Sequence, residues 1–351
     1  MTRCGVAVIT GLVLVAGCGD GDANKTNAAA TSPAAGAPPP AQGYAGQLEQ
    51  AYEQVVKTVL PSVVQIDTDS GLGSGVIYDN RGDIVTNAHV VAGANRLTVT
   101  TATGKKALPA ALIGQYAPDD LAVVRVSNGS LKPARFGDSS RLTVGQIVLA
   151  MGNPLGLSGS VTNGIVSAVG RTVSSPREGA FAGATIAGAV QTSAPINPGN
   201  SGGALVTLNN EVIGIPALAA SDPQIGGAAA GIGFAIPSNM VKLIADQLIK
   251  SGRVTNSGRA ALGVTIRNVA DLAGNVVGVG VASVTKGGPA DRAGIRPNDI
   301  IASVNGTKTP TTAELSDVLA VLKPGDKAQI VVQHPDGSKT TTTVTLGQLP
   351  G

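Results

Sequence analysis

The stretch INPGNSGGAL, residues 196–205, surrounds one serine, Ser201, with glycines, prolines and small polar residues. A serine hydroxyl is a weak nucleophile at neutral pH, so it needs a base within hydrogen-bond reach and a carboxylate that orients this base. Gly199, Asn200 and Gly202 favour a turn whose backbone N–H groups converge on one point without obstruction by Cβ atoms. Such donors stabilise the oxyanion of an acyl transfer. The stretch therefore predicts nucleophilic chemistry at Ser201, provided that a base and a carboxylate lie beside it.

Only two histidines occur in the 351 residues, so the base has two candidates. His89 lies in IVTNAHVV, at the end of an apolar strand, where a histidine among valines is more often a packed core residue than a catalyst. His334 precedes PDG, a tight-turn signal that favours a surface hairpin. Asp119 and Asp120 are the carboxylate candidates, because both come just before the apolar run LAVV. Asp120 adjoins that run, so we expect it to be the more buried and the better orienting group, which gives the chain order His89, Asp120, Ser201.

Ser201 also lies in a G-x-S-x-G pattern, which is typical of the nucleophile turn of an α/β-hydrolase. That fold needs a helix directly after the serine and a triad in the order Ser, Asp, His, which His334 nominally completes. The residues that follow, GGALVTLNNEVIGI, instead favour two strands joined at Asn209 and Asn210. An esterase of the α/β-hydrolase type therefore remains a minor alternative.

The composition limits the other classes of function. With 25 basic and 22 acidic residues, no Lys/Arg cluster, four Tyr and three Phe, the chain lacks the signature of a nucleic-acid-binding protein. Two distant histidines, and no free cysteine in the expected mature chain, provide no ligand cluster, so we expect neither a metal site nor a cofactor. The length favours two or three domains.

The first residues have the pattern of a targeting segment. Arg3 supplies a positive start, VAVITGLVLVAG is an apolar core too short to span a bilayer comfortably, and Cys18 follows it directly. This end resembles a bacterial lipobox, which implies a lipoprotein-type signal peptide over 1–18 and a lipid anchor at Cys18. An ordinary secretory signal with a chance cysteine is the alternative. Cys4 would leave with the signal, so no disulfide is expected, and the Ala/Pro-rich residues 19–46 are expected to form a disordered tether.

The chemistry-bearing residues must be positioned by a β-rich scaffold. Between residues 62 and 236, short apolar runs alternate with turn residues at intervals of about ten, which predicts an antiparallel barrel or a pair of barrels. A helix is predicted on each side of this region, over 47–61 and over 238–252. In the second helix, Ser238 is the expected N-cap and Gly252 the stop.

A smaller module is predicted after about residue 259. It mixes strands with a Gly/Pro turn at KGGPADRAGI, a helix at TTAELSDVLAVL and a hairpin at VVQHPDGSKTTTTV. We therefore expect one β-rich domain over 47–252 and a small α+β domain over 258–349.

The blocks TNAHVV, DLAVV, GNPLGL, INPGNSGGAL and GIGFAIP resemble, in this order, the signature blocks of the HtrA family of trypsin-like serine proteases. The resemblance covers about residues 50–240. It implies a mainly β fold, in which a chymotrypsin-like protease domain of two perpendicular barrels holds a catalytic triad in the cleft between them. It also implies His89 as general base, Asp120 as its orienting group and Ser201 as nucleophile.

The same resemblance implies the groups around the reacting bond. The oxyanion hole would lie at Gly199, Asn200 and Ser201, with the N–H groups of Gly199 and Ser201 as donors. The specificity pocket would be apolar and would suit cleavage after small aliphatic side chains. Its residues would be Gly231, Ile232, Gly233, Phe234 and Ala235.

The C-terminal module resembles the PDZ domains of that family, most clearly in GGPADRAGIRPNDIIASVNG. The segment ALGV would hold the terminal carboxylate of a peptide, which would add as a strand beside GVTI. A spacer domain without a ligand is the alternative. The residues implied for the peptide groove are Leu262, Gly263, Val264, Ile266, Leu315, Val318 and Leu319.

The chain departs from the family before its nucleophile, where an Asp followed by two alanines is usual and this sequence has Ser193, Ala194 and Pro195. The fixed φ of Pro195 and the missing charge at Ser193 are expected to alter the activation loop without removing a triad member. The loop at DTDSGLGSG is short, so the long inter-subunit loop of some relatives is expected to be absent.

These features and the resemblance together predict a serine endopeptidase of the bacterial cell envelope, anchored to the membrane through Cys18. The resemblance further implies that it is ATP-independent, degrades unfolded or damaged proteins, binds peptide C-termini at its PDZ domain and forms a homotrimer through its protease domains. The main alternative is a peptide-binding chaperone or adaptor whose protease site is idle.

Overall fold

A computed structural model of the chain describes residues 43–349, except residues 70, 103, 105, 128–130, 154–158, 176–178, 198, 223–226 and 271–275. The expected signal peptide, Cys18 and nearly all of the expected tether lie outside the described residues.

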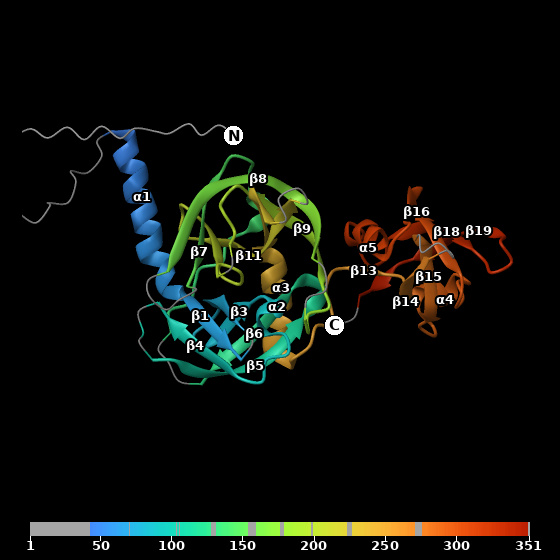
Figure 1. Cartoon of the computed structure of the whole chain (residues 1–351), viewed down its shortest axis with the longest axis horizontal. Helices are drawn as coiled ribbons and strands as arrows, with labels where there is room; N and C mark the ends of the chain where they lie inside the picture. Colours follow the sequence, from blue (N-terminus) through green and yellow to red (C-terminus); the bar gives the residue numbers. More distant parts are fainter. Residues whose placement is uncertain are drawn as a thin grey trace, which may run out of the picture. The chain divides into compact units, whose positions relative to one another are not determined.

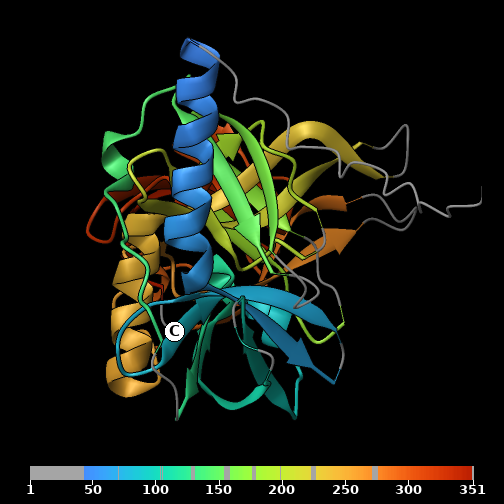
Figure 2. The same ribbon diagram turned by 90° about the vertical axis from the view of Figure 1, so that its left-hand side faces the viewer.

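The folded part opens with helix α1, Tyr44–Val59, which begins three residues before the predicted 47–61 segment. Its buried side is fixed by the spacing of Val55 and Val59, which pack into the core shared with Leu149 of the second barrel. Figure 1 and the turned view in Figure 2 show α1 running along the second barrel before the chain enters the first. No helix among the described residues combines the length and apolar character needed to cross a membrane.

The first barrel is closed and antiparallel, with strand order β1-β2-β3-β6-β5-β4. Its interior holds mainly valine and isoleucine, the residues that fit a pleated, buried surface. Strands β1 and β2 are separated by residues 69–71 only, so the connection at DTDSGLGSG is short, as predicted. The strands are β1 (Val63–Thr68), β2 (Leu72–Ile77), β3 (Asp83–Thr86), β4 (Leu97–Thr101), β5 (Leu108–Tyr116) and β6 (Leu121–Val126).

The second barrel is also closed, with strand order β10-β11-β12-β9-β8-β7. Directly after the Ser201 loop, β10 and β11 form a hairpin whose turn places Asn210 at φ 62°. A hairpin at this position excludes the nucleophile turn of an α/β-hydrolase, and the two-barrel prediction is confirmed. The strands are β7 (Ile147–Gly152), β8 (Ser160–Ser175), β9 (Ala184–Thr192), β10 (Ala204–Thr207), β11 (Val212–Asp222) and β12 (Gly227–Pro237).

Helix α3, Ser238–Ser251, follows the second barrel. It ends as predicted at Gly252, which adopts φ 70°. The predicted N-cap is wrong, because the cap position is Pro237 and the Ser238 side chain makes no capping bond. Ser238 is fully buried, and its hydroxyl donates instead to the carbonyl of Gly137 at 3.0 Å. The Ser238 hydroxyl thus bonds to a residue distant in sequence and not to the first turn of its own helix.

The C-terminal domain has a six-stranded antiparallel sheet, in which β14 pairs with β15 on one side only. Helix α5, Thr312–Ala320, begins with a capping box formed by Thr311 and Glu314. The short helix α4 spans Pro289–Arg292. The strands are β13 (Ala260–Ala261), β14 (Val264–Ala270), β15 (Val276–Val284), β16 (Ile300–Val304), β17 (Thr307–Lys308), β18 (Lys327–Gln333), β19 (Lys339–Thr345) and β20 (Gly347–Gln348).

Candidate active site

The structure brings His89 and Asp120 together in the first barrel. The imidazole Nδ1 lies 2.7 Å from Asp120 Oδ2, and the backbone N–H of His89 donates to Asp120 Oδ1 at 2.9 Å. The Asp120 side chain is 1% exposed, whereas that of His89 is 29% exposed. A carboxylate can only accept, so Nδ1 carries the proton in this pair and Nε2 is left as an acceptor. That tautomer is the one a general base requires.

The backbone around Asp120 fixes this geometry. Asp120 follows the 3₁₀ turn Ala117–Asp119 and adopts φ 53°, a left-handed conformation that is rare outside glycine. Its carbonyl accepts both the N–H of Ala88 at 3.1 Å and the side-chain amide of Asn87 at 3.0 Å. The short helix α2, Ala88–Val91, is thereby held against the start of β6.

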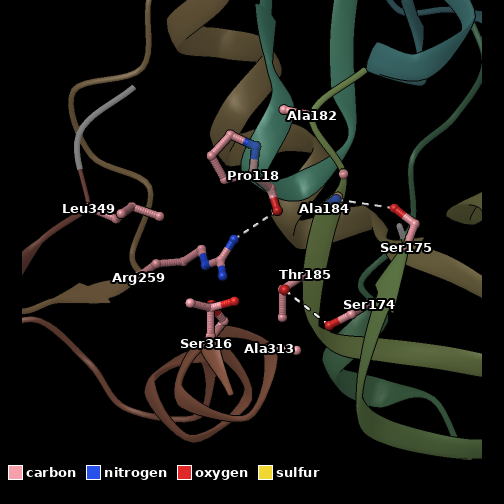
Figure 3. A pocket seen from close by; sticks show the side chains of 12 residues that line it. Pro118, Ser174, Ser175, Ala182, Ala184, Thr185, Arg259, Ala313, Ser316 and Leu349 are labelled. Carbon is pink, nitrogen blue, oxygen red and sulfur yellow. Dashed lines mark hydrogen bonds between the residues drawn. The ribbon is translucent and has the colours of Figure 1, made fainter. Parts of the chain in front are cut away.

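Asp119 is as fully buried as Asp120, so burial does not separate the two carboxylates as predicted. Asp119 instead pairs with Arg259, whose guanidinium donates to Asp119 Oδ1 at 2.9 Å and to the Pro118 carbonyl at 2.8 Å. Figure 3 shows Arg259 directed toward Pro118. Both residues line a cavity of about 370 Å³. Burial raises the pKa of Asp119 to about 6, although Arg259 opposes that rise. The two aspartates therefore differ in the residue that each one contacts, Arg259 or His89, and not in how deeply they are buried.

The Ser201 loop is built on a tight turn. The N–H of Asn200 donates to the carbonyl of Asn197 at 3.1 Å, and Gly199 adopts φ 111°. Gly202 adopts φ 79°, and a Cβ atom there would collide with the carbonyl oxygen of Ser74. Glycine is therefore required where this loop passes the first barrel.

The loop leaves two amides available for an oxyanion. In the described part of the chain, neither the N–H of Gly199 nor that of Ser201 donates to another group. The Asn200 side chain is taken up within the loop, because its amide donates to the Pro195 carbonyl and its oxygen accepts from the N–H of Asn197, both at 3.1 Å. Asn200 therefore braces the loop.

Two hydrogen bonds join the Ser201 loop, through Ser74 of the first barrel, to Thr86, which lies close to His89 in the sequence. The carbonyl of Ser201 accepts from the N–H of Ser74 at 2.9 Å, and the carbonyl of Ser74 accepts from the Thr86 hydroxyl at 2.7 Å. Thr86 is three residues before His89. Among the residues described, no hydrogen bond joins the Ser201 hydroxyl to the imidazole. Catalytic hydrogen bonds of this kind are often long before substrate binds.

The segment before the nucleophile is anchored despite its unusual residues. The Ser193 hydroxyl accepts from the N–H of Ile165 at 3.0 Å, and the N–H of Ser193 donates back to the Ile165 carbonyl at 3.1 Å. The Pro195 carbonyl accepts from the Thr162 hydroxyl at 2.9 Å. Ser193 therefore replaces the missing charge with hydrogen bonds to β8.

The segment predicted to form the specificity pocket lies in β12. Ile232 is 38% exposed, whereas Ala235 is fully buried in the barrel core. A Cβ atom at Gly233 would collide with the side chain of Ile196, so glycine lets that side chain approach the strand. Gly231, Ile232 and the half-buried Phe234 are the residues of this segment that reach the surface.

His334 lies in the predicted β18–β19 hairpin turn and is not an unpartnered surface residue. Its Nδ1 lies 2.8 Å from Asp299 Oδ1 and its Nε2 lies 3.0 Å from the hydroxyl of Thr340. Both ring nitrogens are thus engaged within the C-terminal domain. This arrangement ties the hairpin to the loop before β16.

The C-terminal domain carries a groove of about 350 Å³ along β14 and α5. Because β14 is an edge strand, its free side can accept an added strand. The loop at Gly263, φ 72°, is held by bonds from Thr285 and Ala290. Val318 does not line the groove, and the predicted residues that do are Leu262, Gly263, Val264, Ile266, Leu315 and Leu319.

Within the described residues, no group of three or more His, Cys, Asp or Glu side chains is arranged to hold a metal ion.

Two families match the chain: the trypsin-like peptidase domain over residues 73–215 and the PDZ domain over residues 260–346. The chain is 38% identical over 340 residues to the "Serine protease PepD" of Mycobacterium tuberculosis, covering 92% of this chain and 69% of that protein. It is 38% identical over 302 residues to the "Serine protease Do-like HtrA" of Bacillus subtilis, covering 80% of this chain and 65% of that protein. It is 40% identical over 288 residues to a "Probable periplasmic serine endoprotease DegP-like" of Ectopseudomonas mendocina, covering 80% and 57%. The chain thus spans about two thirds or less of these relatives.

The chain is also similar to solved structures of proteases. The chain resembles "HtrA-type protease AlgW with decapeptide" with a TM-score of 0.57 and 31% identity, covering 86% of this chain and 99% of that one. It resembles the serine endoprotease from Yersinia pestis with a TM-score of 0.57 and 33% identity, covering 85% and 98%.

Proposed function

This chain belongs to the HtrA family of trypsin-like serine endopeptidases, and on that premise we propose that it hydrolyses unfolded or damaged proteins through a triad of His89, Asp120 and Ser201. The observation that carries this assignment is the two-point contact between Asp120 and His89, beside a glycine-rich loop with two available amides. No nucleotide is needed, because the hydrolysis of a peptide bond is itself favourable.

In the proposed first step, the Ser201 hydroxyl oxygen attacks the carbonyl carbon of the scissile bond while His89 Nε2 takes the hydroxyl proton. The N–H groups of Gly199 and Ser201 stabilise the oxyanion. When the C–N bond breaks, His89 gives its proton to the departing amine, which leaves an ester on Ser201. Water then attacks this ester with His89 again as base, releasing the new C-terminus and restoring the hydroxyl. Asp120 holds the imidazole throughout.

The test uses a fluorophosphonate probe and unfolded casein with the wild type and the variants Ser201→Ala, His89→Ala and His334→Ala. We expect labelling and cleavage by the wild type and His334→Ala, and neither reaction with the other two. A wild type that neither labels nor cleaves would contradict the proposal, as would loss of activity in His334→Ala but not in His89→Ala. Protection of unfolded substrate by both wild type and Ser201→Ala, without cleavage, would support a chaperone instead.

We propose that the segment Gly231–Ala235 limits the residue before the scissile bond to small aliphatic side chains. Ile232 and Phe234 offer apolar surface there, and the segment carries no carboxylate that would attract Lys or Arg. Cleavage-site mapping of unfolded casein by mass spectrometry tests this. A majority of cuts after Lys or Arg would overturn it.

We propose that the PDZ domain binds peptide C-termini and thereby regulates the protease. The apolar groove beside the edge strand β14, closed by Leu315 and Leu319, supports this. The assay compares a C-terminal peptide with its amidated form. Equal binding of both forms would contradict recognition of the terminal carboxylate.

We propose that the protein acts in the bacterial cell envelope and is held to the membrane by a lipid on Cys18. The sequence of the first 18 residues supports the anchor, and the word periplasmic in the names of several relatives supports the envelope location alone. Cys18→Ala should release the protein from the membrane fraction. Unchanged membrane association would exclude the anchor.

We also propose a homotrimer that forms through the protease domains, as the family resemblance implies. Light scattering at micromolar concentration measures the mass directly. A monomer under those conditions would refute the trimer.

A further inference from the structure

Ser74 is a buried hydroxyl for which the proposed triad has no role. It lies in β2 of the first barrel, between Gly73 and Gly75, and is 0% exposed. Its oxygen accepts the N–H of Asn153 at 2.8 Å, and its own proton reaches the carbonyl of Gly199 at 2.5 Å. Both partners belong to the second barrel, so one side chain joins the two barrels at the nucleophile loop.

The direction of these bonds follows from chemistry. A serine hydroxyl has one proton and two lone pairs. The N–H of Asn153 can only donate, so Ser74 accepts from it, and the carbonyl of Gly199 can only accept, so the hydroxyl proton goes there. Neither bond can reverse. Ser74 therefore imposes one orientation on the Gly199 carbonyl.

The Gly199–Asn200 peptide is consequently held at both ends. Ser74 binds its carbonyl, and the carbonyl of Asn197 binds its N–H. The peptide is also enclosed, because a Cβ atom on Gly152 would collide with the Gly199 oxygen. With this plane fixed, the direction of the Gly199 N–H depends on the two backbone angles of one glycine, whose φ is 111°.

Ser74 also acts on the next residue of the loop. Its backbone N–H donates to the carbonyl of Ser201 at 2.9 Å, and its own carbonyl is held by the Thr86 hydroxyl at 2.7 Å. Thr86 is itself fully buried. The two residues that would supply oxyanion donors, Gly199 and Ser201, are thus both fastened to Ser74.

We propose that Ser74 is a positioning residue for the oxyanion hole, which orients the Gly199 amide through the adjoining peptide. This inference rests on the proposed acyl-enzyme mechanism. It assigns Ser74 no contact with substrate. Its removal should therefore weaken binding of the transition state and leave binding of the substrate nearly unchanged.

The test compares Ser74→Ala with Ser238→Ala, a matched control. Ser238 is equally buried and donates one hydrogen bond to a carbonyl, that of Gly137, but it belongs to α3. Losing a direct oxyanion donor lowers kcat by about 10²–10³-fold. Because Ser74 acts one peptide away, we expect kcat of Ser74→Ala to fall about 10–100-fold, with KM changed less than about threefold.

A peptidyl boronate provides the readout that a purely structural role would not move. Its tetrahedral adduct on Ser201 places an oxygen at the oxyanion position, so its Ki should rise with Ser74→Ala by about the factor lost in kcat. The Ki of the product peptide that carries the new amino terminus, and so places no oxygen at the oxyanion position, should stay within about threefold. Ser238→Ala should lower the melting temperature less, because it removes one hydrogen bond and Lys242 still donates to the Gly137 carbonyl, and it should keep both kcat and the boronate Ki.

Each outcome has a defined meaning. Wild-type kcat and boronate Ki in folded Ser74→Ala would overturn the inference while the proposed function stands, and inactive wild type or active Ser201→Ala would overturn the proposed function instead. If Ser74→Ala does not fold, Ser74→Cys decides, because a thiol fills the site but donates weakly. A reduced kcat in Ser74→Cys with unchanged KM supports the inference, and wild-type kcat contradicts it.

Discussion

Asp120→Asn tests the assignment of the orienting carboxylate. Asp120 uses both oxygens on His89, one for the backbone N–H at 2.9 Å and one for Nδ1 at 2.7 Å. An asparagine has one acceptor and one donor in the same place. If its oxygen keeps the backbone N–H, its NH₂ group faces Nδ1, and the imidazole must move its proton to Nε2. The proposed base then points a proton, not a lone pair, at Ser201.

The alternative orientation of the substituted amide is no better. With its oxygen toward Nδ1, its NH₂ group would oppose the backbone N–H of His89 at a site where Asp120 is 1% exposed, so two donors would face each other out of water. In a triad of this kind, exchanging the carboxylate for an amide lowers kcat by about 10⁴-fold, and each tenfold is about 1.4 kcal/mol. We therefore expect a loss of about 10³–10⁴-fold in kcat, or roughly 4–5.5 kcal/mol.

The chain supplies its own control in Asp119→Asn. Both aspartates are fully buried and adjacent, but Asp119 contacts Arg259 and not His89. The assay is hydrolysis of a peptide substrate at pH 8, normalised to the folded fraction measured by circular dichroism. We expect Asp119→Asn to keep kcat within about tenfold of wild type. Activity retained by Asp120→Asn but lost in Asp119→Asn would refute the assignment.

Three further predictions follow from the contacts. The pKa of Asp119 rises from 3.8 to about 6 on folding, so the folded state binds this proton more tightly than the unfolded state. As pH rises from about 4 to 6, the free energy of unfolding of the wild type should therefore fall relative to that of Asp119→Asn, by up to roughly 3 kcal/mol in thermal or urea unfolding. A relative gain would contradict the shift. Gly202→Ala should lower the melting temperature, and the fraction of protein that an active-site titrant labels, more than Gly170→Ala does. Both glycines have positive φ, but only Gly202 is enclosed by neighbouring atoms. Equal effects would show that backbone strain alone matters. Leu319→Asp in the groove should weaken binding of a C-terminal peptide at least about tenfold in calorimetry. Val321→Asp, at a site that is 68% exposed and outside the groove, should leave binding unchanged. Equal weakening by both substitutions would contradict the assigned groove.

The parts of the fold that the sequence predicted are those set by neighbouring residues. The hairpin at Asn210 follows from turn residues between two β-rich runs, and with the chain order of the triad it disfavoured the α/β-hydrolase alternative. Gly252 ends α3 because a left-handed cap suits glycine. The helix predicted at TTAELSDVLAVL is present as α5, Thr312–Ala320, and the capping box that begins it, at Thr311 and Glu314, lies within four residues. In each case the decisive interaction is short in sequence.

The features that sequence reasoning missed depend on distant residues. Asp119 is as buried as Asp120 because Arg259, 140 residues later, covers and pairs with it. One of the two partners of the His334 ring, Asp299, lies 35 residues earlier in the sequence. Ser238 looked like a helix cap, but a buried carbonyl 101 residues away accepts its hydroxyl. Such partners leave no local pattern.

The nucleophile loop shows why this division matters for function. Its glycines could be interpreted from the sequence, since they permit positive φ and close approach. Glycines allow this conformation but do not select it. A glycine-rich turn can adopt several conformations, and only one directs two amides at the reacting oxygen. Here the orientation is supplied by Ser74, 125 residues before Gly199 and in the other barrel. The only local trace of that role is a serine between two glycines in a strand. In this chain the first barrel thus completes the Ser201 loop of the second, so correct docking of the two barrels should precede activity.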